Sequence, residues 1–170
     1  MRKLLLLAAA LATCTPVQAA PARSRAAQQL YDKGFHDCAG ALDRVVKAEH
    51  DDDTAYSFLD VWSTTAANTS LASTLTVQQY SDARVVRSIS VVKNPAGKCD
   101  VVMTSVFPIL DQTCTAMRAT AFKDWKLNEE LGAVEIYQDP SSPSSTVTMH
   151  PLGLNGCLLV KQAVGYEAEP

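Results

Sequence analysis

Four cysteines constrain this chain more than any other feature of its sequence. Cys38, Cys99, Cys114 and Cys157 remain once a leader that contains Cys14 is set aside. An even number of cysteines in an exported chain is typical of disulfides. No two of them are spaced Cys-x-x-Cys, which argues against a thioredoxin-like redox site and against a zinc ribbon. We therefore expect two disulfides and an oxidising compartment.

Residues 1–19 have the pattern of a secretory signal peptide. Arg2 and Lys3 are positively charged, residues 4–11 are apolar, and small residues lead to a cleavage site. The apolar run is shorter than the roughly 20 residues that a membrane-spanning helix needs. We expect residues 20–170 to form one exported domain, periplasmic or secreted, without a membrane span.

Cys14 offers an alternative for the N-terminus. The string Leu11-Ala12-Thr13-Cys14 resembles the lipobox of bacterial lipoproteins, although Thr13 stands where that motif has Gly, Ala or Ser. The resemblance implies acylation of the cysteine, a lipid anchor and an outer-membrane location. Cleavage after Ala19 would instead remove Cys14.

The charge balance bears on the class of partner. Without Arg2 and Lys3, the 15 basic residues become 13 against 18 acidic residues, which makes the net charge −5. A mildly acidic chain is a poor ligand for nucleic acid or anionic membrane surfaces. A basic protein partner would complement this negative charge. The alternative explanation is that the charge only keeps an exported domain soluble.

Periodicity and turn residues predict an α+β fold. It has two amphipathic helices packed on an antiparallel sheet of about six to seven strands, because the connections between strands are short. The expected helices are 24–50 and 111–126, and the expected strands are 55–62, 75–80, 84–92, 99–107, 131–137, 146–149 and 157–161. We expect the polar residues 164–170 to be a frayed tail.

The cysteines also raise the question of an internal duplication. Gly97-Lys98-Cys99 and Asn155-Gly156-Cys157 each place a cysteine directly after a turn, and each half begins with a helix that carries a cysteine. This pattern is a weak signal of a repeated α-β-β unit, because a cysteine after a turn also occurs by chance in disulfide proteins, and a single unit without duplication is the preferred interpretation.

The spacing of the elements predicts the disulfide pairing. A strand from Cys99 to Phe107 spans about 26 Å, which places Cys99 roughly 20 Å from Cys114, whereas bridged Cα atoms lie within about 7 Å. The preferred pairing is therefore Cys38–Cys99 with Cys114–Cys157.

Candidate catalytic and metal-binding motifs are weak. Ser90-Val91-Val92-Lys93 matches S-x-x-K, but a strand places Ser90 and Lys93 on opposite faces. His36-Asp37, and His50 with Asp residues 51–53, lack the spacing of known metal motifs. We expect no enzyme activity, no cofactor and no metal.

The remaining expectation is a binding function. A small acidic frame held by disulfides predicts a protein-binding domain in the periplasm, of the inhibitor or immunity-protein type, whose partner is another protein. The alternatives are an envelope structural or assembly factor, favoured if Cys14 is acylated, and a small hydrolase. Residues 63–74, which contain the sequon Asn68-Thr69-Ser70, are either a solvent loop or a protein-binding edge. We expect Trp62 and Trp125 to anchor the core.

Overall fold

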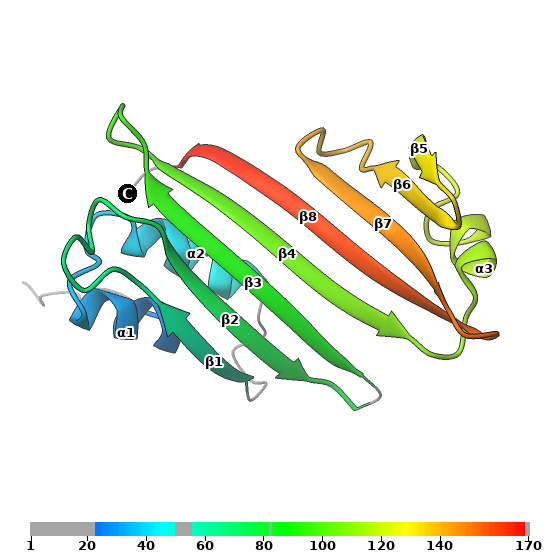
Figure 1. Ribbon diagram of the computed structural model, residues 1–170, viewed down its shortest axis with the longest axis horizontal. Helices are drawn as coiled ribbons and strands as arrows, with labels where there is room; N and C mark the ends of the chain where they lie inside the picture. Colours follow the sequence, from blue (N-terminus) through cyan, green and yellow to red (C-terminus); the bar gives the residue numbers. More distant parts are fainter. Residues whose placement is uncertain (1–22, 50–55, 82, 169–170) are drawn as a thin grey trace, which may run out of the picture.

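A computed structural model describes residues 23–49, 56–81 and 83–168, and Figure 1 shows its arrangement. These residues form one eight-stranded antiparallel sheet and three helices. The elements are α1 (Arg25–Asp32), α2 (Ala39–Glu49), β1 (Tyr56–Val61), β2 (Ala72–Gln79), β3 (Arg84–Lys93), β4 (Cys99–Ile109), α3 (Cys114–Ala119), β5 (Lys126–Leu131), β6 (Val134–Gln138), β7 (Ser145–Leu152) and β8 (Gly156–Ala168). The signal peptide 1–19, Cys14, His50 and residues 51–53 lie outside the described residues.

The predicted α+β class, with two long helices on six to seven strands, is wrong, because the chain is mostly sheet. The expected helix 24–50 is two helices, α1 and α2. They are separated at Gly34, whose φ of +95° is a left-handed conformation that favours glycine and ends a helix. The expected helix 111–126 shrinks to the six residues of α3. Residues 126–131 form the edge strand β5 instead.

The two halves of the chain have similar orders of elements, with helix before sheet. The first half has two helices, α1 and α2, and the second has one, α3. In each half a four-stranded meander follows, and the fourth strands β4 and β8 pair at the centre in the strand order β1-β2-β3-β4-β8-β7-β6-β5. The repeated unit is therefore larger than the predicted α-β-β unit, since it contains four strands. Figure 1 shows β4 and β8 side by side in the middle of the sheet.

Each half holds one disulfide in an equivalent place. Cys38, just before α2, is bonded to Cys99, the first residue of β4. Cys114, the first residue of α3, is bonded to Cys157 near the start of β8. These are the two pairings predicted from the spacing of the elements, and each ties the start of a helix to the fourth strand of its own meander.

All three helices pack on the same face of the sheet, which we call the helical face. The first core joins Leu30, Phe35 and Leu42 to Ile89 and other inward residues of β2–β4. Figure 1 shows α1 and α2 behind these strands. Full burial of each large apolar side chain contributes about 1.5–3 kcal/mol. The helical face is therefore what holds the fold together.

The second core lies beneath α3. Its buried residues are Phe122, Tyr137, Val147, Met149, Cys157 and Leu159. The cross-strand register places the strand residues of both cores on the helical face, since Met149 pairs with Leu159 and Ile109 pairs with Cys157. The opposite side of the sheet, which we call the open face, contributes to neither core.

Two central strands run further than predicted. β4 continues through Pro108 to Ile109, because its pairing with β3 stops at Val106 and Pro108 has a neighbouring strand on one side only. Residues 164–168, predicted to be part of a frayed tail, continue β8 and pair with the first residues of β4. The paired strands β4 and β8 join the two halves over nearly their whole length.

Candidate functional site

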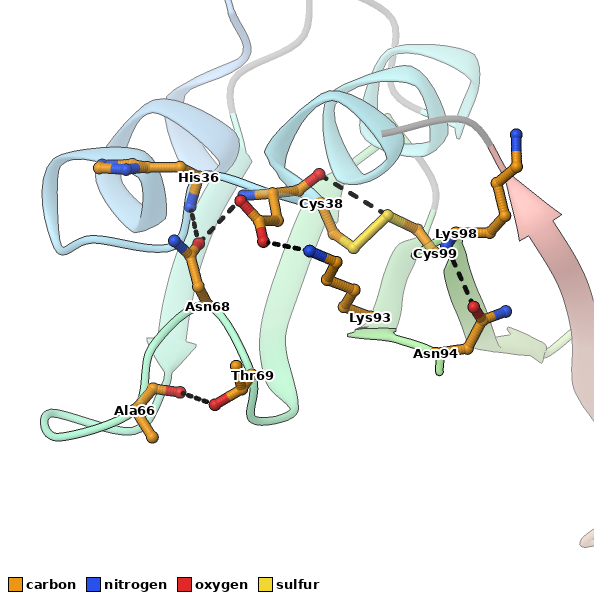
Figure 2. Close-up of polar contacts among 10 residues, drawn as sticks. His36, Cys38, Ala66, Asn68, Thr69, Lys93, Asn94, Lys98 and Cys99 are labelled. Carbon is orange, nitrogen blue, oxygen red and sulfur yellow. Dashed lines mark hydrogen bonds and ion pairs between the residues drawn. A yellow bond between two sulfur atoms is a disulfide. The ribbon is translucent and has the colours of Figure 1, made fainter. Parts of the chain in front are cut away.

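The loop between β1 and β2 is fastened to the linker between α1 and α2 (Figure 2). The Asn68 side-chain oxygen accepts hydrogen bonds from the backbone N–H groups of His36 at 2.6 Å and Asp37 at 3.0 Å. Lys93 donates to the Asp37 carboxylate at 2.7 Å. The side-chain carbonyl of Asn68, the first residue of the sequon, thus has a structural role. Of the segment 63–74, predicted to be a loop or a binding edge, residues 72–74 belong to β2.

The S-x-x-K residues do not come together. Ser90 lies on the open face, where its hydroxyl is 3.0 Å from the Ser73 hydroxyl of the neighbouring strand. Lys93 lies on the helical face and forms its ion pair with Asp37. A lysine on the other side of the sheet cannot activate this serine as a nucleophile.

The described histidines have structural neighbours. The His36 ring packs on Tyr31 with ring centroids 4.5 Å apart, and His150 Nε2 lies 2.9 Å from the Thr148 hydroxyl. Residues 23–49, 56–81 and 83–168 contain no group of three His, Cys, Asp or Glu side chains that could hold a metal ion. Trp62 packs partly buried against the first core, and Trp125 against the second.

The open face is the largest feature that the packing leaves unexplained. Within the described chain, the helices pack on the helical face only. Six aliphatic residues of the open face are 36–64% exposed: Leu59, Val61, Leu75, Val102, Leu131 and Leu152. Antiparallel sheets with one solvated face normally place polar residues there. Exposed apolar residues on a sheet face that no helix covers are typical of an interaction surface.

Charge is confined to the margins of the open face. On the four central strands, Arg84 lies at the start of β3, and Asp100 lies near the start of β4 and accepts a hydrogen bond from the Asn94 amide. Between them, the register places on this face only aliphatic, proline, hydroxyl and amide side chains, together with His150 and the terminal Tyr166. A partner with an uncharged apolar surface could dock there without leaving a buried charge unpaired.

Asp60 is a buried carboxylate on the edge strand β1. It points to the helical face, is 7% exposed, and neither of its oxygens has a hydrogen-bond partner among the described residues. Burial raises the pKa of this carboxyl, and the neighbouring Thr74 hydroxyl lowers it by less. An inward-pointing charge on an edge strand discourages pairing with another chain. This edge is therefore a poor place for a partner strand.

The helical face also contains a cavity of about 250 Å³ beneath the segment that follows α3. Its lining is apolar except for one lysine: Phe107, Phe122, Trp125, Val147, Leu159 and Lys161. It lies on the opposite side of the sheet from the open face, because Phe107 and Leu159 pair on the helical face.

No protein-family model, curated protein or solved structure matches this chain. In the described ranges, no helix is long and apolar enough to cross a membrane. The candidate sites therefore rest on geometry and chemistry alone.

Sequence reasoning missed both the open face and the cavity. The open face had a signal, since Val85-Val86, Val91-Val92 and Val101-Val102 place aliphatic residues on both sides of their strands. Such runs are typical of strands that are buried on two faces. The cavity had no comparable signal, because its lining comes from four separate segments between Phe107 and Lys161.

Proposed function

We propose that this chain is an exported protein-binding domain, of the inhibitor or immunity-protein type, that docks its partner on the open face of the sheet. The observation that carries the proposal is that, among the described residues, the only charged side chains of the central strands on this face are Arg84 and Asp100 at its margins, while six aliphatic residues of the face are exposed. The partner it suits is a different protein with an apolar and uncharged surface patch. Charged residues are depleted at the centres of such interfaces.

The frame supports this proposal. Two disulfides and two packed cores on the helical face keep the open face preformed. A preformed surface loses little conformational entropy on binding, which favours affinity. Disulfides also persist in oxidising compartments, which supports export.

The test compares one open-face variant with one matched control. Val102→Lys places a charge at the centre of the open face, where Val102 is 36% exposed, and Leu154→Lys places the same charge on a turn residue that is 94% exposed. Extracts of the producing cell and of its competitors are captured on wild type and on both variants, and the captured protein is then purified and titrated. We expect one stoichiometric protein that binds wild type and Leu154→Lys, with at least tenfold weaker binding to Val102→Lys.

Two results would overturn the proposal. One is a partner that binds Val102→Lys as tightly as wild type, because the docking surface would then lie elsewhere. The other is a wild-type dimer in sedimentation analysis that Val102→Lys converts to a monomer. In that case a second copy of this chain occupies the open face.

A further inference from the structure

The cavity on the helical face combines an apolar interior with a single charged group. Phe107 and Leu159 are directly paired across β4 and β8. Phe122 and Trp125 form another part of its wall, with ring centroids 4.8 Å apart in an edge-to-face arrangement. A cavity of this composition favours an apolar group of a ligand and orients it through few polar contacts.

Lys161 is the charged group of the lining. It is half-buried on β8 and lies directly across from Ser105 of β4 and Val147 of β7. Within the described residues, no hydrogen bond or ion pair involves its ammonium group. Asp139 interacts with Lys161 through space, without a hydrogen bond between the two side chains. The pKa of Asp139 is lowered mainly by hydrogen bonds from Ser141, and the charge of Lys161 lowers it by less.

A buried hydroxyl group lies beside Lys161 in the register. Ser105 is 0% exposed, and its hydroxyl has no hydrogen-bond partner among the described residues. Ser105 is not part of the cavity lining, so Lys161 is the polar group of this cavity that a ligand reaches.

A second cation lies on the other side of Ser105. Arg87 pairs with Ser105 across β3 and β4, and its guanidinium carbon is 5.9 Å from the centre of the Phe107 ring. Its Nη1 donates to Gln78 at 2.8 Å, and its Nε lies 3.6 Å from the Glu49 carboxylate. Glu49 and Gln78 are the polar partners of Arg87, and Lys161 is the cation of the cavity lining.

We propose that this cavity binds a small monocarboxylic acid. Its apolar tail lies among the aromatic and aliphatic side chains, and its carboxylate binds the Lys161 ammonium group. A volume of about 250 Å³ holds roughly eight groups of water size, at about 30 Å³ each. A straight-chain acid of about eight carbons matches this size. The site is independent of the open face, on the other side of the sheet.

Calorimetric titration with sodium octanoate tests the proposal. Octanol has the same tail without the charge, and Lys161→Met removes the cation while keeping an unbranched apolar side chain. Lys126→Met, on the exposed edge strand β5, is the matched control. We expect one octanoate per chain, at least tenfold weaker binding of octanoate to Lys161→Met, no change with Lys126→Met, and octanol binding that is weak and insensitive to Lys161→Met. Absence of octanoate binding at millimolar concentration would overturn the proposal, and so would equal affinity for octanoate and octanol.

The two tryptophans report where the acid binds. Trp125 lines the cavity, whereas Trp62 packs against the first core. In a nitrogen–proton correlation spectrum of wild type, octanoate should shift the Trp125 indole N–H signal and leave the Trp62 signal in place. Equal shifts of both signals, or a shift of Trp62 alone, would place the binding elsewhere and refute the site.

Discussion

Removal of the disulfide between Cys114 and Cys157 is expected to destabilise the chain strongly and to release α3 first. The bond joins residues separated by 43 positions. For a loop of this length, restriction of the unfolded chain contributes about 4 kcal/mol. None of the six residues of α3 is buried, so the disulfide is the main attachment of this helix to β8. The double variant Cys114→Ala/Cys157→Ala should lose about 4 kcal/mol of its free energy of unfolding.

Urea denaturation and hydrogen exchange together measure this loss. With a denaturant slope of about 2 kcal/mol per M, the urea midpoint should fall by about 2 M. Amide exchange should rise first over residues 114–125, while β1–β4 stay protected. The control is Cys38→Ala/Cys99→Ala, whose bond closes a separation of 61 residues, and which should lose a similar free energy without releasing residues 114–125. An unchanged midpoint, or exchange that rises equally in both halves, would refute this reasoning.

Three further substitutions test the local interactions. Burial raises the pKa of the Asp60 carboxyl above its ordinary value of 3.8. The folded state therefore binds the carboxyl proton more tightly than the unfolded state, and stability is lost as the pH rises from about 4 through the folded-state pKa. Asp60→Asn should therefore be more stable than wild type at pH 7, by on the order of 1 kcal/mol, and the gain should shrink toward pH 3; urea midpoints whose difference is independent of pH would contradict this. Asn68→Ala removes the acceptor of two backbone N–H groups and should cost about 1 kcal/mol in thermal denaturation, whereas Asn68→Asp, which keeps the acceptor, should cost less. Leu42 is 0% exposed and Leu154 is 94% exposed. Leu42→Ala should therefore lose about 2–5 kcal/mol of the free energy of unfolding, and Leu154→Ala less than about 0.5 kcal/mol. Similar losses for both variants in urea denaturation would show that the first core is packed differently.

The first meander was the most predictable part of the fold. Strands 84–92 and 99–107 were predicted within two residues of β3 and β4. Their β-branched residues alternate in burial, and Asn94 caps the turn by accepting hydrogen bonds from the backbone N–H groups of Ala96 and Lys98. Local chemistry is sufficient there, because the hairpin is closed by neighbours in the sequence.

The outer and terminal strands were not predictable in the same way. All six residues of β5 are exposed, so burial of one face imposes no alternation of apolar and polar residues on their sequence. Without that alternation, a strand cannot be distinguished from the end of a helix. Residues 164–168 became strand because β4 provides a partner for them, which is a tertiary effect that overrides weak local preference. The candidate sites depend on this tertiary arrangement. The open face needs all eight strands in order, and the cavity needs Lys161 to lie near Phe107 and Phe122 from distant parts of the chain.

The pairing of β4 with β8 has a consequence for assembly. Each disulfide lies within one half, and each central strand also serves the core of the other half. Phe107 and Ile109 of β4 pack against the second core, while Ala163 and Ala168 of β8 pack against the first. Two molecules that opened this pair and exchanged their second halves would restore both cores and keep every disulfide. The duplicated topology therefore gives the chain a route to a domain-swapped dimer that costs no native contact outside the connection between β4 and α3.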